Sequence, residues 1–284
     1  MKAVKLKILS NQQVSQRYWH MVVDASELQE DVKPGQFFNI RCAEEYYPLL
    51  RRPFSIYRIN KQEGTLEFLY LVKGIGTQRL TGLTTGERVD VFGPLGEGFT
   101  LKTTEAAKAP ASGNNNFAKE NGESGVPGKI LMLARGVGIA TLAALAQEAS
   151  EQGVQSVAII SARTRNDLLA AEALESCGTE VYKVTEEDGN SGVEHVGQLL
   201  ERLMQEHQIQ AAYTCGSKRL AKLLQDMAEA KGIYAEIALE ENMGCAMGVC
   251  FACVCDLRQA GDTVRTVRVC KEGPVFPLEQ VVLT

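Results

Sequence analysis

Histidine, the commonest side chain of catalytic and metal-binding sites, is scarce in this chain. The 284 residues include only three histidines, His20, His195 and His207. Their spacing matches neither a catalytic triad nor a metal site, so we interpret them as surface or helix-face residues. The histidines therefore give no sign of a catalytic acid, base or nucleophile, and we name no catalytic residue.

An excess of basic residues and a long apolar run are also missing. Thirty Lys and Arg residues face 35 Asp and Glu residues, a net charge of −5, which argues against nucleic acid as the main partner because phosphate binding needs a basic face. The best candidate for a membrane span, residues 130–146, carries Arg135 and two glycines, and a span needs about 20 apolar residues. The first ten residues lack the apolar stretch of a signal peptide. We expect a cytoplasmic protein without a membrane span.

Eight cysteines need an explanation other than disulfides in a reducing compartment. Cys245, Cys250, Cys253 and Cys270 follow the pattern C-x4-C-x2-C, then sixteen residues, then C. The first two gaps are those of plant-type [2Fe-2S] ferredoxins. The alternative is a zinc site with four cysteine ligands, although zinc ribbons usually pair two C-x2-C knuckles. We predict a [2Fe-2S] cluster on these four cysteines and interpret Cys255 as a packed strand residue.

Short apolar or alternating segments fill the first hundred residues, separated by turn signals such as Lys33-Pro34-Gly35 and Gly93-Pro94. Several short strands at close spacing, with no long helical stretch between them, indicate an antiparallel barrel or sandwich. The expected strands are 4–9, 18–23, 36–40, 54–59, 66–72 and 87–92.

From residue 129 onward, strands alternate with helices, which implies a parallel sheet with helices on both faces. The expected strands are 130–134, 156–161, 180–184, 211–215 and 234–239, and the expected helices are 139–150, 166–175, 193–207 and 218–231. The segment before them is rich in Ala, Lys, Asn, Ser and Gly and is typical of a surface insert. We divide the chain into a β-barrel at 1–101, an insert or linker at 102–128, a nucleotide-binding α/β domain at 129–232 and a cysteine-containing domain at 233–284.

A glycine turn, Gly136-Val137-Gly138, joins the first strand of the α/β half to its helix. Glycines let a pyrophosphate approach the backbone, although many such turns carry them for packing alone. The later strand ends, including Ser161-Ala162-Arg163 and Cys215-Gly216-Ser217, share the sheet edge where ligands of open α/β sheets bind. The predicted dinucleotide contacts are Gly136, Gly138, Thr141 and Gly216.

Two places in the first domain could hold a second phosphate group. Arg51 and Arg52 stand at the start of an apolar strand that continues to Ser55. Arginine can clamp a diphosphate and serine can hydrogen-bond a ring nitrogen, whereas the simpler interpretation is a solvated basic turn. The segment 73–77 opens a short helix whose N-terminus offers N–H donors.

Together these motifs resemble the ferredoxin–NADP reductase superfamily, and more closely the iron–sulfur electron-transfer subunits of two-subunit, NAD-dependent bacterial dihydroorotate dehydrogenases. The resemblance covers nearly the whole chain apart from 103–128. Its carriers are Arg52-Pro53-Phe54-Ser55, Gly74-Ile75-Gly76-Thr77, residues 93–99 with the motif G-P-L-G-x-G-F, the four cysteines, and Gly273-Pro274-Val275-Phe276. The chain departs from the family at Arg135, Thr141 and Ala246, where glycine, proline and glycine are usual.

The resemblance implies an antiparallel flavin-binding β-barrel, a parallel α/β nucleotide-binding domain and a small C-terminal [2Fe-2S] domain. It implies FAD contacts at Arg52, Pro53, Phe54, Ser55, Gly76 and Thr77, an NAD(H) site, and cluster ligands at Cys245, Cys250, Cys253 and Cys270. A nicotinamide exchanges two electrons and a cluster one, and a flavin can convert between them. The second α/β strand ends at Arg163 rather than at an acidic residue, so the motif alone leaves NADP open.

The implied partner is an FMN-containing dihydroorotate dehydrogenase of pyrimidine biosynthesis, joined in a hetero-oligomer such as a heterotetramer. We expect Met243, Met247, Val249 and Phe251 to form part of that contact, since methionine and aromatic residues are enriched at interfaces. For Val249 and Phe251, packing around the cluster is an equal alternative. The alternatives are a reductase subunit of a hydrogenase- or sulfide-dehydrogenase-like complex, and a zinc-stabilised binding module without a redox role.

Overall fold

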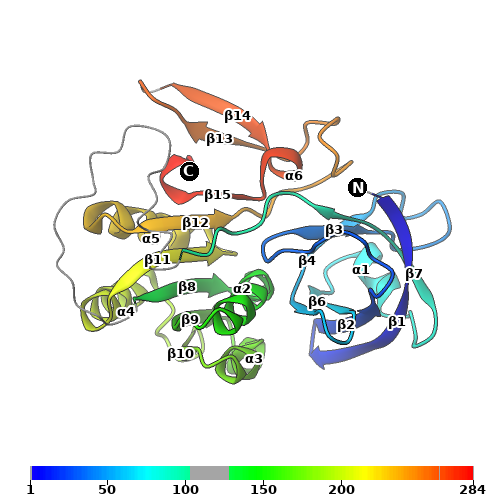
Figure 1. The fold of residues 1–284 in the computed structure, drawn as a ribbon, viewed down its shortest axis with the longest axis horizontal. Helices are drawn as coiled ribbons and strands as arrows, with labels where there is room; N and C mark the ends of the chain where they lie inside the picture. The colour runs from blue at the N-terminus through cyan, green and yellow to red at the C-terminus, as the bar shows by residue number, and fades with distance from the viewer. Residues whose placement is uncertain (1, 103–127, 262, 284) are drawn as a thin grey trace.

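Two β-sheets of different kind make up most of the molecule. The computed structural model describes residues 2–102, 128–261 and 263–283, and the predicted insert lies almost wholly outside them. In Figure 1 the antiparallel sheet of the N-terminal half lies beside the α/β half, with a β-hairpin and a long loop from the C-terminal segment across the top. None of the helices in the described residues is both long and apolar enough to cross a membrane.

The first sheet is antiparallel throughout and has the strand order β4-β3-β7-β1-β2-β6-β5. Its strands are β1 (Lys2–Ser15), β2 (Tyr18–Asp24), β3 (Phe37–Ile40), β4 (Arg52–Ser55), β5 (Arg58–Asn60), β6 (Thr65–Leu71) and β7 (Arg88–Leu95). The sheet curls on itself, since the rings of Phe54 in β4 and Tyr70 in β6 lie 5.4 Å apart although four strands separate them in the sheet. The enclosed core includes Phe38 and Phe68, and burying each such side chain contributes about 1.5–3 kcal/mol.

The expected single strand at 54–59 is wrong, because the chain changes its pairing partner inside that segment. β4 pairs with β3, whereas β5 pairs with β6. The backbone N–H of Ile56 donates to Gln36 and that of Tyr57 donates to Glu67, at 3.3 and 2.8 Å, so the change occurs between these two residues. A short helix, α1 (Ile75–Leu80), follows β6 as expected.

The second sheet has the order β10-β9-β8-β11-β12-β15, and its first five strands are parallel. These strands are β8 (Lys129–Arg135), β9 (Ser156–Ala162), β10 (Glu180–Thr185), β11 (Ile209–Cys215) and β12 (Tyr234–Ala238), and the helices are α2 (Ile139–Glu151), α3 (Ala171–Ser176), α4 (Val193–Glu206) and α5 (Lys218–Lys231). Alternate residues of β8 face opposite sides: Ile130 and Met132 pack with α2 and α3, and Leu131 and Leu133 pack with α4 and α5. The predicted antiparallel and α/β fold is confirmed.

The helix expected at 166–175 is shorter than its periodicity suggests. A 3-10 turn, η3 (Arg165–Asp167), comes first, and α3 begins only at Ala171. Ala170 has φ 60°, a left-handed conformation that interrupts a right-handed helix. The chain therefore leaves β9 in an irregular loop.

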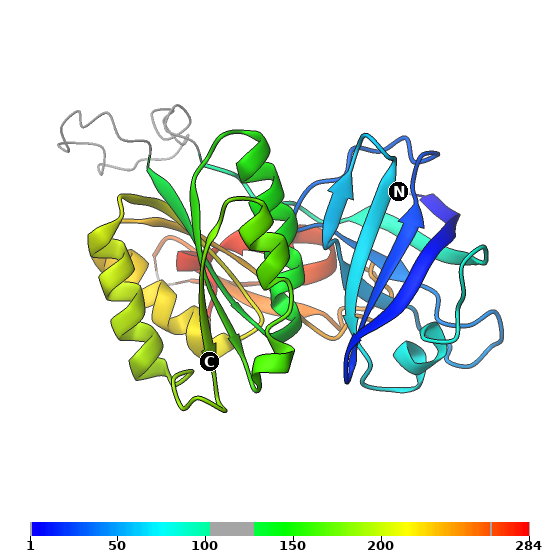
Figure 2. The same cartoon turned by 90° about the horizontal axis from the view of Figure 1, so that it is seen from below.

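Helix α2 fastens the two halves together, and Figure 2 shows it between the α/β sheet and the barrel. The side-chain amide of Gln147 in α2 donates to the carbonyl of Ile59 at 2.6 Å and accepts from its N–H at 3.1 Å. A second contact joins the rings of Phe99 and Tyr213, whose centroids lie 5.6 Å apart. The carboxyl ends of β8, β11 and β12 face the barrel as well, because Val137, Cys215 and Ala238 line one cavity with Arg52 and Phe54.

The C-terminal segment returns to the second sheet. It contains the hairpin β13 (Val254–Arg258) and β14 (Val264–Arg268), then α6 (Val269–Glu272), β15 (Val275–Pro277) and the turn η4 (Leu278–Gln280). β15 pairs antiparallel with β12. The sheet is therefore mixed, whereas we expected a purely parallel one. Strands of the predicted domains 129–232 and 233–284 thus share one sheet, and the domain boundaries themselves stay a prediction.

Candidate functional site

A cavity of about 480 Å³ lies between the barrel and the carboxyl ends of the α/β strands. Its walls come from β4, from the turn into α1, from the turn into α2 and from residues 238–243 after β12. Five of the six predicted flavin residues line it: Arg52, Pro53, Phe54, Ser55 and Thr77. An apolar cavity with a few converging polar groups is the usual form of a cofactor site.

Arg52 is held against the first turn of α1. Its Nη1 donates to the carbonyls of Leu50 and Arg51 at 2.8 and 3.1 Å. A β-carbon on Gly76 would lie 3.2 Å from Nε of Arg52, so glycine is what allows this close approach. The hydroxyl of Thr77 accepts from the N–H of Lys73 at 3.0 Å, so it shapes the turn beside the arginine.

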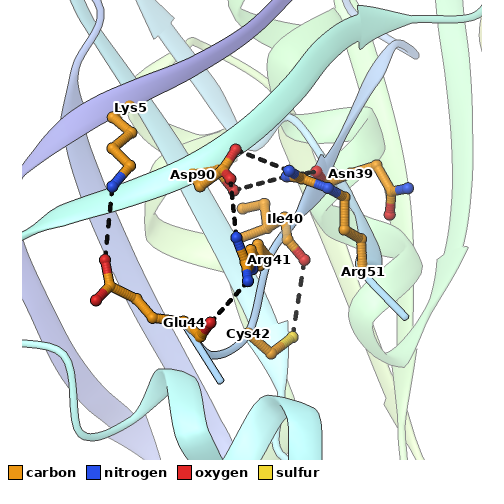
Figure 3. Close-up of polar contacts among 8 residues, drawn as sticks. All are labelled: Lys5, Asn39, Ile40, Arg41, Cys42, Glu44, Arg51 and Asp90. Atoms are coloured by element: carbon orange, nitrogen blue, oxygen red, sulfur yellow. Dashed lines mark hydrogen bonds and ion pairs between the residues drawn. The ribbon is translucent and has the colours of Figure 1, made fainter. Parts of the chain in front are cut away.

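The neighbouring arginine has a different task, which Figure 3 shows. Nη2 of Arg51 lies 2.9 Å from Oδ1 of Asp90, and Nη1 donates to the carbonyls of Asp90 and Asn39 at 3.0 and 3.3 Å. These bonds tie β4 to β7 and β3. Arg51 is therefore occupied structurally, and only Arg52 lines the cavity.

The predicted glycines of the α/β half bring two turns together. A β-carbon on Gly138 would lie 2.7 Å from the carbonyl carbon of Cys215, and one on Gly216 would lie 2.3 Å from the carbonyl oxygen of Arg135. Close packing of the two turns is therefore enough to explain glycine at positions 138 and 216. Gly136 has φ 57°, and a β-carbon on it would have only the Tyr18 hydroxyl nearby, at 3.9 Å. The space beside its backbone is therefore open to a ligand.

Arg135, which stands where the family usually has glycine, points across the strand ends. Its Nη1 donates to Oγ of Ser161 at 2.7 Å, and its Nη2 pairs with Glu186. The guanidinium is thereby held by β9 and by the loop after β10. The arginine links three neighbouring strand ends.

In the cavity a thiol lies close to a carboxyl group, a pair that the sequence analysis did not predict. Sγ of Cys215 lies 3.8 Å from Oγ1 of Thr141 and 3.9 Å from Oε1 of Glu240. Burial raises the pKa of the Cys215 thiol well above its ordinary value, so this thiol stays neutral. Glu240 directly follows the last expected parallel strand, and the strand-end rule could have found it.

The predicted cluster cysteines lie in a loop whose backbone N–H groups point at sulfur. The N–H groups of Met247 and Val249 both donate to Sγ of Cys245 at 3.4 Å, and that of Cys245 donates to Cys250 at 3.4 Å. The N–H of Cys270, from α6, donates to Sγ of Cys253 at 3.4 Å. Such donors stabilise thiolates and tune the potential of a cluster.

The four cysteines approach one another as two pairs, Cys245 with Cys250 and Cys253 with Cys270. Within the described residues, which include all eight cysteines, no three His, Cys, Asp or Glu side chains converge as ligands of one ion. Two pairs suit a centre of two metal ions with four cysteine ligands. The ligand set itself stays a prediction.

Two other features of the loop follow from its geometry. Ala246 has φ 54°, in the left-handed region that glycine adopts freely, which explains why glycine is usual there. Cys255 lies in β13 opposite Val267, and burial raises the pKa of its thiol to about 11. Cys255 is thus in a strand, as predicted.

The tip of the loop is apolar and open to solvent. Met247, Val249 and Phe251 are exposed by 52%, 73% and 62%. The guanidinium of Arg268 lies 5.0 Å from the centre of the Phe251 ring. Met243 instead lines the cavity, so only three of the four expected contact residues are at the tip.

Without a cluster, Cys245 is expected to be the most reactive thiol of the loop. Burial opposes its ionisation, but N–H groups of Met247, Cys250 and Val249 outweigh that and lower its pKa to about 6. Its thiolate fraction therefore rises as the pH passes through about 6 and is nearly complete at pH 8. Iodoacetamide labelling of cluster-free protein, read by peptide mass spectrometry from pH 5 to 9, should modify Cys245 before Cys255. Equal labelling rates of both at pH 7 would contradict this.

Known sequences match this chain at both domain and full length. Residues 240–282 match the family described as the iron-sulfur cluster binding domain of dihydroorotate dehydrogenase B. The electron transfer subunit of dihydroorotate dehydrogenase B (NAD(+)) from Desulforamulus reducens is 33% identical over 99% of this chain and 98% of its own. Those from Bacillus cereus strain B4264 and Geobacillus thermodenitrificans are 31% and 32% identical over 100% and 98% of both chains.

Solved structures share the fold. An NADH-dependent reduced ferredoxin-NADP oxidoreductase has a TM-score of 0.75 and 22% identity, covering 99% of this chain and 90% of that one. The ferredoxin-NADP+ reductase of Plasmodium falciparum has a TM-score of 0.60 and 13% identity, covering 83% of this chain and 96% of that one.

Proposed function

This chain belongs to the family of dihydroorotate dehydrogenase B electron transfer subunits, and we propose that it carries electrons between NAD(H) and a partner dehydrogenase. The carriers are FAD and a [2Fe-2S] cluster, and the final acceptor or donor is a flavin, FMN, on a dihydroorotate dehydrogenase of pyrimidine biosynthesis. We place the hetero-oligomer, a heterotetramer by family resemblance, in the cytoplasm.

One observation carries the proposal: the cavity and the cysteine loop are consecutive in the chain and in space. Glu240, Glu241, Asn242 and Met243 line the cavity, and Cys245 begins the loop two residues later. A cofactor in the cavity and a cluster on the loop would therefore be neighbours. Short separation is what electron transfer between bound cofactors requires of the protein.

The barrel residues suit a flavin with a diphosphate. Arg52 offers a guanidinium that its carbonyl contacts orient, and charge-assisted bonds to phosphate are the strong ones. Ser55 lines the same cavity with its hydroxyl unpaired among the described residues, so it can hydrogen-bond a ring atom. When bound, FAD supplies the exchange of a two-electron hydride for single electrons.

The α/β residues form the opposite wall. Val137 comes from the turn after β8, Ala140 and Thr141 come from the first turn of α2, and Cys215 ends β11. Because the Cys215 thiol is fully buried and stays neutral, it excludes water from this wall without adding charge. Gly136 keeps the nearby backbone open for a pyrophosphate, so a nicotinamide could reach the cavity from that side.

The purified chain, loaded with flavin and cluster, is expected to reduce a dye with NADH but not to oxidise dihydroorotate. In this proposal the flavin fills the cavity of about 480 Å³, and the carbon substrate binds to the partner. Steady-state dye assays with NADH and then with dihydroorotate measure both reactions.

Addition of the native dihydroorotate dehydrogenase should restore NAD-dependent dihydroorotate oxidation, and a catalytic subunit of another redox complex should not. Turnover of dihydroorotate by the isolated chain would refute the subunit role. Co-purification with a hydrogenase-like or sulfide-dehydrogenase-like protein in place of the dihydroorotate dehydrogenase would favour the alternative reductase.

A further inference from the structure

We propose that the ion pair of Arg165 and Asp188 makes this chain select NAD(H) by disabling the arginine that would bind the 2′-phosphate of NADP(H). The inference rests on the proposed function, because it concerns the dinucleotide of the same site. It assigns a specificity role to two residues that follow β9 and β10.

The ion pair is bidentate and joins an Arg165 side chain that is 72% exposed to an Asp188 side chain that is 26% exposed. Nε of Arg165 lies 3.0 and 3.2 Å from Oδ1 and Oδ2 of Asp188, and Nη2 also donates to Oδ1. The hydroxyl of Thr185 donates to Oδ2 at 2.7 Å and accepts from the N–H of Asp188 at 3.0 Å. The pKa of Asp188 is lowered, first by the Arg165 contact and then by Thr185, so the carboxylate stays charged.

The two loops that carry the pair are joined along their backbones. The N–H groups of Glu186 and Glu187 donate to the carbonyls of Ala162 and Arg163 at 3.1 and 3.0 Å. The carboxylate of Glu187 also accepts from the N–H of Arg165 at 2.9 Å. The position of the arginine is therefore built into the edge of the sheet.

This edge opens onto a second cavity. It measures about 780 Å³ and lies between the barrel residues Tyr57 and Arg58 and the start of α3, with Arg165 and Asp188 among its lining residues. Its volume is within the range of small-molecule sites. A dinucleotide with its pyrophosphate at the β8 turn would extend along the ends of β9 and β10, so its adenosine would reach this cavity.

The residues of this cavity favour a ribose hydroxyl over a 2′-phosphate. Asp188 engages Nε and Nη2 of Arg165, and Lys183, a second cation of this cavity, lies 2.9 Å from a carboxylate oxygen of Glu175. Arg58 also lines the cavity, and the neighbouring Glu186 is paired with Arg135. A 2′-phosphate, which carries about two negative charges, would therefore have to displace the Asp188 carboxylate to use Arg165 fully. A ribose hydroxyl can instead donate to a carboxylate, as in other NAD sites.

Arg163 does not take over the missing role. Its side chain is exposed and is not among the residues that line this cavity, whereas Arg165 is.

The test titrates AMP and adenosine 2′,5′-bisphosphate into the FAD- and cluster-loaded chain by calorimetry. We expect the wild type to bind the bisphosphate at least tenfold more weakly than AMP. Asp188→Asn should free Arg165 and lower the ratio of the two dissociation constants, bisphosphate over AMP, at least tenfold. The double variant Asp188→Asn with Arg165→Ala should return this ratio to near the wild-type value. The ratio of kcat/KM for NADPH and NADH in the dye assay should move in parallel, through the KM of NADPH.

Glu172→Gln is the matched control, because it removes a negative charge from the same cavity but leaves the ion pair intact. A ratio within twofold of wild type in Asp188→Asn would overturn the proposal, as would equal effects of Asp188→Asn and the double variant, or of Glu172→Gln. Flavin absorbance and thermal unfolding report whether each variant is folded. A wild type that binds neither AMP nor NADH would instead refute the proposed function, and this inference with it.

Discussion

Cys253→Ser is expected to cost the protein its iron and the visible absorbance of a [2Fe-2S] cluster. Cys253 is buried in the loop and accepts the N–H of Cys270 at 3.4 Å, so its sulfur lies where two chain segments meet. A serine there gives a harder oxygen ligand where an iron–sulfur cluster prefers thiolate. Iron analysis and absorbance spectra of protein purified under anaerobic conditions measure the loss.

The matched control is Cys255→Ser, two residues away. Cys255 lies in β13 opposite Val267, after the loop whose backbone N–H groups point at sulfur. Cys255→Ser should keep full iron content, and Cys245→Ser, Cys250→Ser and Cys270→Ser should lose it. A cluster that survives Cys253→Ser but not Cys255→Ser would show that the ligand set has been misassigned. Zinc in place of iron in the wild type would support the structural-zinc alternative.

The contrast between these two cysteines shows what spacing alone can predict. Gaps of four and two residues identify Cys245, Cys250 and Cys253 because a tight loop must place its ligands at fixed intervals. The fold class was equally predictable, since the change from alternating strands to strand–helix units is a local pattern. Both signals reside in short stretches of sequence.

Features that depend on distant partners were not predictable in the same way. The change of strand partner at Ile56 and Tyr57 is set by Gln36 and Glu67, neither of which is near in sequence. The antiparallel strand β15 pairs with β12 although the cysteine loop and the β13–β14 hairpin separate them in sequence. No local pattern could therefore predict this pairing. The strand-end rule places Thr141, Cys215 and Glu240 at one edge of the sheet, but it does not predict that their side-chain atoms lie 3.8 and 3.9 Å apart.

Arg51 and Arg52 illustrate the same limit at the scale of one residue. Adjacent in sequence, both are cations at the start of a strand, and both could bind a diphosphate. Neighbouring side chains on a strand point to opposite faces. One therefore meets Asp90 and the other lines the cavity, a distinction that depends on where β7 lies.

Arg52→Ala is expected to weaken FAD binding by roughly ten- to hundredfold. Hydrogen bonds to a charged group contribute about 1.5–3 kcal/mol, and each 1.4 kcal/mol is a factor of ten. The effect should fall on the cofactor, because the internal partners of Arg52 are backbone carbonyls at the start of its own strand. Fluorimetric titration of FAD into flavin-free protein gives the dissociation constant.

The control variant Arg51→Ala distinguishes a direct loss of FAD binding from a general loss of structure. The Arg51–Asp90 pair is half-buried and holds β4 to β7 and β3, so its removal should lower the free energy of unfolding by about 1–3 kcal/mol. FAD affinity should then change by less than about threefold, since Arg51 does not line the cavity. Arg52→Ala should show the reverse, with near-normal stability without flavin and poor FAD binding. If Arg51→Ala loses flavin while Arg52→Ala retains it, the diphosphate lies on the far side of β4 and the cavity assignment fails.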